Sequence, residues 1–214
     1  MADNYLESRY EAVFGKGPKA PSVKQRPSLD TLLKKNRSVR GYSKDYVVHE
    51  LQLRTMVSVN SKIPSAMNQQ ALRFHIVTKG PESDIVNRNI RLGAALPELH
   101  LPFPGTEPEA FIIVASEKEE NSYLDIDLGI SLQSMLLKAV EMGLNGIIIK
   151  NFNPAKLAQE LGMPQELKPL CVLAVGKSIE KIETVEAKPG ESLKYYRENG
   201  VHYVPKIKPD DLLF

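Results

Sequence analysis

The sequence is nearly devoid of cysteine, which removes two common ways of building a small protein. Cys171 is the one cysteine among 214 residues, so neither a disulfide framework nor a cysteine-based metal site can form from it alone. A chain of this length can bury a full hydrophobic core without a covalent staple. Cys171 lies in the apolar run LCVLAVG, and because free cysteine is among the most buried residue types, we predict a buried thiol in a strand.

Long hydrophobic runs are also missing. The first residues, MADNYLESRYEAVF, are charged and lack the apolar core of a secretory signal. No apolar run approaches the roughly 20 residues that a transmembrane helix needs. These two absences predict a cytoplasmic protein without a membrane partner.

The chain also lacks a large excess of positive or negative charge. The 28 Lys and Arg residues against 26 Asp and Glu give a net charge of +2. This balance argues against nucleic-acid binding, which needs a broad basic face. The hydrophobic fraction of 42% and the charged fraction of 25% are those of a soluble globular protein. Local cation clusters that bind one small anion remain possible.

Most catalytic signatures are absent as well. The sequence has no G-x-x-x-x-G-K-[ST] loop, no G-x-G-x-x-G fingerprint and no G-x-S-x-G elbow. Its four histidines are scattered, without an i, i+4 pair, so we expect no metal site. Asp125 and Asp127 are two positions apart and would point in different directions on a helix. We interpret them as capping residues of that helix rather than as an acid–base pair.

The pattern along the chain predicts one domain over residues 28–214, after an N-terminal extension over residues 1–27. Within the extension, NYLESRYEAVF is compatible with a short helix, and the proline-rich GKGPKAPSVKQRP indicates an extended linker. The domain alternates helical and strand patterns without regular βαβ spacing. Helices are predicted over 28–36, 49–60, 82–96, 122–146 and 153–164, and strands over 73–80, 110–116, 146–151 and 170–177.

The strongest helix pattern begins at Ser122 and is marked at its end by Gly143. Its apolar stripe, broadened by neighbouring apolar positions, predicts a buried helix; the stripe consists of Leu128, Leu132, Met135, Leu136 and Ala139. The segment LHLPFPGTEPE, residues 99–109, has three prolines and a glycine and is long enough to be a lid. The last 35 residues are polar, with YYRENGVHYVPKIKP the only patterned part. We predict an α+β layered domain with a small sheet against the buried helix.

A cluster of cations follows the first helix of this domain. Arg37, Ser38 and Arg40 bring two guanidinium groups and a hydroxyl into four residues. Such a set can hold a phosphate, because Arg offers planar and permanently charged donors. The same set can also be a solvated basic helix end that is favourable to the helix dipole. Taken alone, the stretch favours the second interpretation.

Two further loops have the composition of a binding site. KIPSAMNQQ, residues 62–70, combines small residues with hydroxyl and amide groups between a helix and a strand. GLNGIIIKNFN, residues 143–153, leaves the buried helix between two glycines and offers an apolar wall of three isoleucines. An ordinary turn and a plain core strand explain these loops equally well when each is taken alone.

In order along the chain, four motifs resemble the nitroreductase family of FMN-dependent flavoproteins. They are RSVRGY, PSAMNQQ, DLGISLQSMLLKAVEMGLNG and a late VPK, and the resemblance runs from about Ser28 to Lys208. Each motif is weak by itself, whereas four in this order are fairly specific. The resemblance implies a three-layer α/β/α sandwich with a small, mostly antiparallel sheet around a buried central helix. It also implies an intertwined homodimer with FMN in two clefts at its interface.

The resemblance assigns residues to this cofactor. Arg37, Ser38 and Arg40 would hold the phosphate, the ribityl chain and the pyrimidine edge, and Arg40 would tune the flavin. Lys206 and Lys208 would return to the phosphate from the other end of the chain. No catalytic side chain is implied, since hydride is received at flavin N5. The remaining positions would lie against the ring: Pro64, Ser65, Ala66 and Asn68 from the partner subunit, and Ile148, Ile149, Lys150 and Asn151 from the same chain.

The sequence departs from the family pattern at two places. Asn36 stands where many relatives have an additional arginine, and Gln70-Ala71-Leu72 stands where Gln-Pro-Trp is usual. These changes leave the FMN assignment intact and the acceptor side open, where residues 99–109 and the NRNIR segment are expected to shape the cleft. The resemblance implies ping-pong two-electron reduction of nitroaromatics, quinones or similar acceptors by NADH or NADPH. The alternatives are a specialised dehalogenase or flavin-cleaving enzyme, or a flavin-binding module without turnover.

Overall fold

The computed structural model describes Arg9, residues 12–13, residue 15 and residues 27–214. The short helix and the linker predicted within residues 1–27 therefore lie almost wholly outside the described residues. Helix α2 (Leu29–Lys35) begins where the sequence predicts, because the Ser28 hydroxyl accepts a hydrogen bond from the Thr31 backbone N–H at 3.2 Å.

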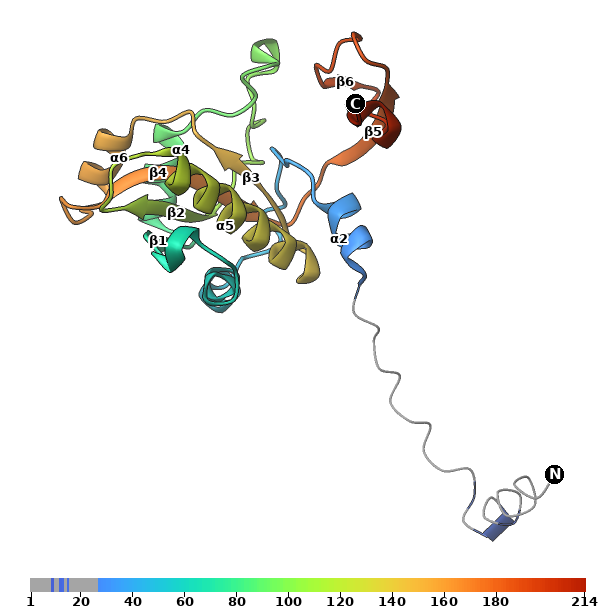
Figure 1. Cartoon of the computed structure of the whole chain (residues 1–214), viewed down its shortest axis with the longest axis horizontal. Helices are drawn as coiled ribbons and strands as arrows, with labels where there is room; N and C mark the ends of the chain where they lie inside the picture. The colour runs from blue at the N-terminus through green and yellow to red at the C-terminus, as the bar shows by residue number, and fades with distance from the viewer. Residues whose placement is uncertain (1–8, 10–11, 14, 16–26) are drawn as a thin grey trace.

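A four-stranded sheet forms the centre of the molecule (Figure 1). Its strands lie in the order β1-β2-β4-β3, and every neighbouring pair is antiparallel. The strands are β1 (Leu72–Val77), β2 (Ala110–Ser116), β3 (Asn145–Ile149) and β4 (Lys168–Gly176). All four strands were predicted, and Cys171 is a fully buried thiol in β4 whose pKa burial raises to about 11.

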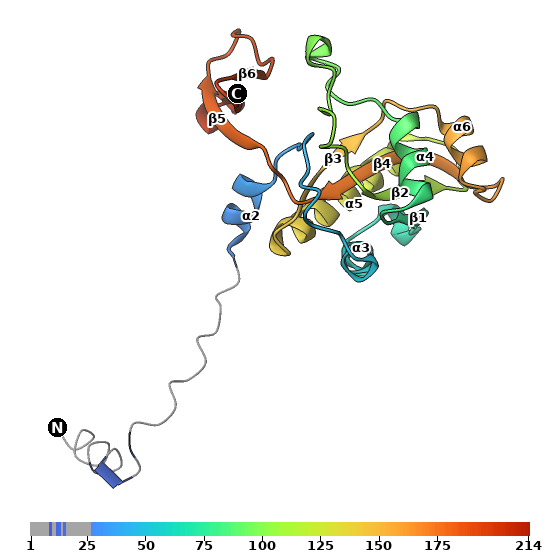
Figure 2. The ribbon, with the colours of Figure 1, turned by 180° about the vertical axis from the view of Figure 1, so that it is seen from behind.

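Helices cover both faces of this sheet, which explains why its two central strands, β2 and β4, are buried along nearly their whole length. On one face, α3 (Glu50–Val57) and α5 (Ser122–Glu141) pack against Ile112, Val114 and Leu173. On the other face, α4 (Pro81–Asn89) and α6 (Pro154–Glu160) pack against Phe111, Ile113 and Val172. The view from behind shows α4 and α6 on the side away from α5 (Figure 2).

Helix α5 buries the predicted stripe of leucine, methionine and alanine side chains. Asp125 lies in the first turn of the helix as predicted, but the N-cap is Asn121, whose side chain accepts from the backbone N–H groups of Tyr123 and Leu124, both at 3.1 Å. Asp127 is buried, and its carboxylate accepts a hydrogen bond from the backbone N–H of Ala66 at 2.8 Å. Asp127 therefore anchors the loop before β1 and is not a helix cap.

Two other expectations need correction. The helix predicted over residues 82–96 ends at Asn89, before the run Arg91–Leu96, and only a short 3-10 turn (Pro97–Leu99) follows. More 3-10 turns occur at Ser58–Ser61, Ala66–Asn68 and Pro209–Leu212. The last 35 residues were expected to be largely unpatterned, but they form a second sheet.

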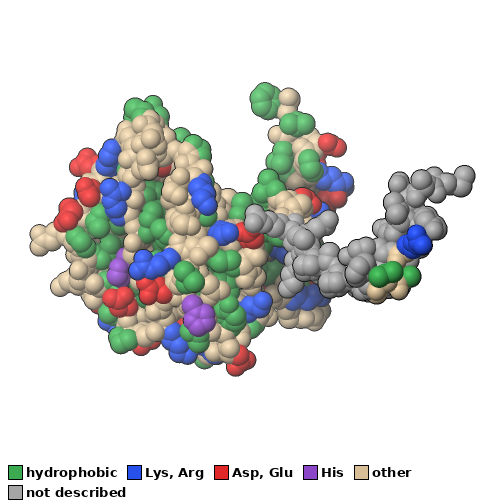
Figure 3. Space-filling view, turned by 90° about the horizontal axis from the view of Figure 1, so that it is seen from below, with side chains coloured by type: hydrophobic (Ala, Val, Ile, Leu, Met, Phe, Trp, Pro, Cys, Tyr) green, Lys and Arg blue, Asp and Glu red, His purple; other side chains and the backbone are tan. Residues whose placement is uncertain are grey.

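This second sheet stands apart from the main sheet and beside α2 (Figure 1). It consists of β5 (Lys181–Ala187), β6 (Tyr196–Glu198) and β7 (Val201–Ile207). β7 lies in the middle, parallel to β5 and antiparallel to β6. The space-filling view shows a smaller part that is set off from the main body and carries hydrophobic side chains (Figure 3).

Candidate functional site

A cavity of about 280 Å³ lies where the two sheets approach each other. The loop after α2 contributes Arg37, Ser38 and Arg40 to its lining, and β7 contributes Lys206. Cations from the two ends of the domain therefore line one cavity, although Lys206 is the only lysine of the second predicted cluster among them. The rest of the lining comes from the end of α2, from α5 and β3, and from the second sheet with the residue before β6: Asn36, Gln133, Leu136, Ile148, Tyr195, His202 and Val204.

Strand β3 holds the Arg37–Arg40 loop in place. Ser38 pairs with Gly146 as an isolated parallel bridge, and the Val39 N–H donates to the Gly146 carbonyl at 3.1 Å. Any side chain at Gly146 would bring its Cβ to 2.3 Å from the Ala174 carbonyl oxygen, so this close approach requires glycine. The Asn145 side chain donates to the Lys35 carbonyl at 2.7 Å.

Arg40 is the most enclosed cation of the loop, with 9% of the residue exposed. Its Nη1 donates to the Ser38 carbonyl at 3.2 Å, and its guanidinium lies 4.6 Å from the ring centroid of Tyr195. The backbone N–H of Arg40 donates to Glu180 at 2.8 Å, and the other oxygen of that carboxylate accepts from Arg197. The Glu180 carboxylate thus pairs with the Arg197 guanidinium and the Arg40 backbone, and the set keeps an excess of positive charge on the Arg40 guanidinium.

Arg37 and Lys206 also line the cavity and are more exposed than Arg40. The Arg37 guanidinium donates to the carbonyls of Leu33 at 2.7 Å and Lys34 at 3.0 Å, so it caps the end of α2. Burial lowers the pKa of Arg37, but arginine remains cationic at neutral pH. Lys208 does not line this cavity, and its ammonium pairs with Glu186 at 2.8 Å.

Unpaired polar atoms gather around this cavity. Among the described residues, the buried side-chain nitrogen and oxygen atoms without a hydrogen-bond partner are Arg40 Nε, Arg197 Nε and both ring nitrogens of His202. Because buried polar groups are nearly always hydrogen-bonded, such a cluster calls for a specific explanation. The arrangement can receive a polar, anionic ligand that supplies the missing partners.

The strand leaving α5 contributes only part of its predicted set. Ile148 is 41% exposed and lines the cavity, whereas Ile149 points the other way and is buried among residues of the opposite face. Lys150 and Asn151 follow the strand and are exposed. The Lys150 ammonium lies 3.8 Å from Glu120, and the Asn151 carbonyl accepts from the Arg91 N–H at 2.9 Å.

The loop over residues 64–68 lies at a different place. Pro64 and Ser65 line a second cavity of about 460 Å³ between α5 and β1, which shares no residue with the first. Met67 and Asn68 have φ angles of 51° and 53°, and both are exposed. Non-glycine residues in this region store about 1 kcal/mol or more of strain each, and such strain is common at functional sites. Ala66 is fixed there by its hydrogen bond to Asp127.

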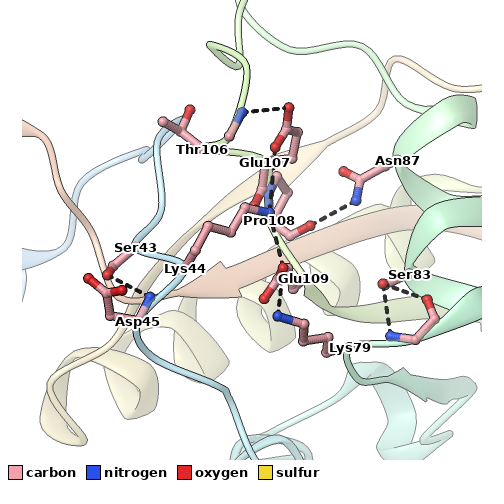
Figure 4. Close-up of polar contacts among 12 residues, drawn as sticks. Ser43, Lys44, Asp45, Lys79, Ser83, Asn87, Thr106, Glu107, Pro108 and Glu109 are labelled. Carbon is pink, nitrogen blue, oxygen red and sulfur yellow. Dashed lines mark hydrogen bonds and ion pairs between the residues drawn. The ribbon is translucent and has the colours of Figure 1, made fainter.

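A network of charges fixes the base of the 99–109 loop (Figure 4). The ammonium groups of Lys44 and Lys79 lie 3.1 and 3.2 Å from the same carboxylate oxygen of Glu109. Burial disfavours ionisation of Glu109, but the two ammonium groups outweigh it and hold the pKa of that carboxyl below its usual range. Lys44 also reaches the Glu107 carbonyl at 3.0 Å. Both ammonium groups are therefore already paired with Glu109, and the network serves to hold the loop in place.

Sequence reasoning missed the part of the site that comes from the C-terminal sheet. Glu180, Tyr195, Arg197 and His202 were not named, although three of them fall at or within the patterned run near the end of the chain. Their proximity to Arg40 arises from pairing between β6 and β7, where Arg197 faces His202. The one signal in the sequence was the spacing of His202, Val204 and Lys206. Because alternate residues of a strand share a face, this spacing places His202 on the same face as Lys206.

Comparison with known proteins places this fold in a family. A model of the nitroreductase family matches residues 33–177, so the chain belongs to the nitroreductase family. Residues 178–214, which carry the whole of the second sheet, lie outside that match. No curated protein sequence matches the chain.

Solved structures share the fold at low sequence identity. A nitroreductase family protein from Streptococcus pneumoniae is 17% identical, with a TM-score of 0.61 over 78% of this chain and 96% of its own. A nitroreductase in complex with FMN from Desulfovibrio desulfuricans is 20% identical, with a TM-score of 0.59 over 73% and 89%. A mutant FMN- and NADPH-dependent nitroreductase from Sphingopyxis is 18% identical, with a TM-score of 0.61 over 72% and 89%.

The described residues lack two kinds of feature. None of their helices combines the length and apolar character that crossing a bilayer requires. No group of three or more His, Cys, Asp or Glu side chains in the same part of the chain is arranged to hold a metal ion.

Proposed function

We propose that this protein is an FMN-dependent oxidoreductase that takes electrons from NADH or NADPH and reduces nitroaromatic, quinone or similar acceptors in a ping-pong cycle. The observation that carries the proposal is the meeting of Arg37, Ser38 and Arg40 with Lys206 at one cavity. Family membership and the FMN named for solved relatives support the same cofactor. A cytoplasmic location and a single domain over residues 28–214 are part of the proposal.

The residues around the cavity fit the three chemical parts of FMN. A phosphate carries close to two negative charges and needs cations when it is buried, and Arg37 and Lys206 supply them. The ribityl chain and the pyrimidine edge need hydrogen-bonding partners, and the unpaired atoms of Arg40 and His202 are available. Apolar contact for the ring is available from Leu136, Ile148 and Val204.

When bound, FMN supplies the hydride chemistry, accepting two electrons from the nicotinamide donor and passing them to the acceptor. The protein then has to bind, orient and tune the cofactor. Arg40 is held rigidly by Ser38, Tyr195 and Glu180, so its fixed charge can stabilise negative charge on the pyrimidine edge. This role requires neither a catalytic acid nor a metal.

The proposal includes an intertwined homodimer of three-layer sandwiches. In one chain, Pro64 and Ser65 line a cavity other than the one lined by Arg37 and Lys206. A flavin ring in the first cavity can meet the 64–68 loop if that loop comes from a second copy. Exposed apolar side chains on α2 and α5 suit such a contact, among them Leu29, Leu33, Tyr123 and Ile126.

The first experiment is the visible spectrum of the protein reconstituted with FMN, followed by addition of NADH or NADPH without oxygen. We expect the flavin absorption to bleach with one donor or both and to return when a quinone or nitroaromatic is added. If flavin binds but neither donor reduces it, the protein is a flavin-binding module without turnover. If no flavin binds, the proposal is overturned.

A matched pair of variants tests the role of Lys206. Losing a charge-assisted contact costs about 1.5–3 kcal/mol, so Lys206→Ala should weaken FMN binding by at least about tenfold. Lys181→Ala, on the neighbouring strand, should leave FMN affinity unchanged, because that lysine pairs with Glu183 on the surface. Titration by flavin fluorescence measures both constants, and equal affinities for the two variants would contradict the role of Lys206.

A further inference from the structure

The histidine on β7 is the most unusual polar group of the molecule. His202 is 2% exposed, yet neither of its ring nitrogens has a hydrogen-bond partner. It lines the same cavity as Arg40 and Lys206. A buried imidazole with two unpaired nitrogens at a cavity wall needs hydrogen-bond partners, and a ligand in the cavity can supply them.

Strand geometry places His202 and Lys206 too far apart for both to contact one small group. His202, Val204 and Lys206 alternate along β7 and all line the cavity. Four residues of strand span about 13 Å, which is much longer than a phosphate group. An extended cofactor with its phosphate at Lys206 therefore presents another part of itself to His202.

The surroundings of His202 decide its charge. Arg197 faces it across the β6–β7 pair, the Tyr195 ring lies 5.1 Å away, and Arg40 stacks on that ring. Glu180 is the one carboxylate among these groups and is already paired with Arg197. Burial, followed by the positive charges of Arg197 and Arg40, lowers the pKa of His202 to about 4. The imidazole is neutral at neutral pH, with one donor and one acceptor nitrogen.

We propose that His202 contacts the uncharged polar part of the flavin, the ribityl hydroxyls or the pyrimidine edge, through both ring nitrogens. A phosphate dianion offers only acceptors and would leave one imidazole nitrogen unpaired, whereas a hydroxyl or the imide edge offers both a donor and an acceptor. This assignment rests on the proposed FMN function. It adds a cofactor residue from outside the part of the chain that the family model matches.

Riboflavin lacks the phosphate of FMN. Comparing the affinities for the two flavins therefore distinguishes residues that contact the phosphate from residues that contact the rest of the cofactor. We expect His202→Leu to weaken FMN and riboflavin binding by the same factor of about tenfold, which corresponds to about 1.4 kcal/mol. Lys206→Ala should weaken FMN binding and leave riboflavin binding unchanged. His202→Gln, which keeps a donor and an acceptor, should recover part of the affinity for both flavins. His75→Leu, at a histidine paired with Glu82 on the far side of the domain, is the control and should change neither.

A larger loss for FMN than for riboflavin in His202→Leu would assign the imidazole to the phosphate and overturn the inference. Unchanged affinities in a folded His202→Leu protein would overturn it too. If the variant does not fold, the imidazole resonances of the wild type provide the test. Substitution of His49, His75 and His100 assigns their ring signals, so the signals that remain belong to His202. Addition of riboflavin must shift these His202 signals, and unshifted signals would reject the contact. Failure of the wild type to bind either flavin would instead reject the proposed function.

Discussion

Glu180 is the single residue that makes the charge distribution around Arg40 tolerable. Its side chain is 6% exposed, and it accepts from the Arg40 backbone at 2.8 Å while pairing with the Arg197 guanidinium. Burying the Arg197 guanidinium beside Arg40 without this carboxylate would be costly, because an unpaired charge loses its hydration without compensation. The same carboxylate joins the C-terminal sheet to the loop that carries the predicted phosphate residues.

Removal of this carboxylate should therefore destabilise the protein strongly. Breaking one partner of a buried ion pair costs about 3–5 kcal/mol, so Glu180→Ala should lower the free energy of unfolding by that amount in the flavin-free protein. The control is Glu183→Ala, three residues along the chain, whose pair with Lys181 is exposed and contributes less than about 1 kcal/mol. Urea denaturation of both variants measures the difference, and similar small losses would show that Glu180 does not carry this charge balance.

At the scale of elements, the site depends on how α2 is attached to β3. Asn145, the first residue of β3, donates to the Lys35 carbonyl at 2.7 Å and accepts from the Arg37 N–H at 3.4 Å. The bridge between Ser38 and Gly146 continues this contact. The end of the helix and the start of the strand thus act as one support for Arg37 and Arg40.

Asn145→Ala should loosen that support and weaken FMN binding. Each lost hydrogen bond costs about 1 kcal/mol, and we expect FMN affinity to fall several-fold because the loop is no longer held in its binding position. Asn153→Ala provides the control, since it removes the N-cap of α6 at a similar cost of about 1 kcal/mol but lies away from the cavity. Unfolding curves and FMN titrations should show comparable losses of stability and an affinity loss in Asn145→Ala alone. Equal FMN affinities would contradict the role of Asn145.

Local sequence patterns were sufficient for the main sheet and for α5, because the central strands are continuous apolar runs and α5 carries an apolar stripe with a helical period. They failed for the second sheet for a physical reason. In β5, Ile182 and Val185 are three residues apart rather than two, and most of the strand is exposed. No alternation marks such a strand, and its parallel partner β7 comes from a non-local pairing. Asp127 was misinterpreted in the same way, since its partner at Ala66 is distant in sequence.

In the candidate site, too, the residues of a local motif could be predicted and those brought in by tertiary contacts could not. Arg37, Ser38 and Arg40 are recognisable as a short motif, and a late lysine could be joined to them only through the family resemblance. His202 and Glu180 have no motif, because their roles follow from tertiary contacts with Arg40 and Arg197. Position in the strand, rather than residue type, decides that Ile148 reaches the cavity and Ile149 does not.

At the scale of the whole molecule, one chain keeps the two predicted halves of the flavin site apart. Pro64 and Ser65 line the cavity beside α5 and β1, while Arg37 and Lys206 line the cavity beside the second sheet. Exposed apolar residues at the C-terminal end, Leu212, Leu213 and Phe214, add surface that a second copy would cover. A homodimer brings the halves together only if each 64–68 loop serves the other chain.

Mixed dimers of two defective variants test this arrangement directly. The first variant, Arg37→Ala with Lys206→Ala, loses the phosphate residues and keeps its loop. The second, Ser65→Ala with Asn68→Ala, loses the loop groups and keeps the phosphate residues. Each homodimer should bind FMN weakly, but a mixed dimer unites the intact cavity of the second variant with the intact loop of the first. Mixed dimers purified through two different tags should therefore recover tight binding of one FMN per dimer. If each loop served its own chain, every cavity in the mixed dimer would remain defective and titration would show no recovery, because no chain would carry both intact halves.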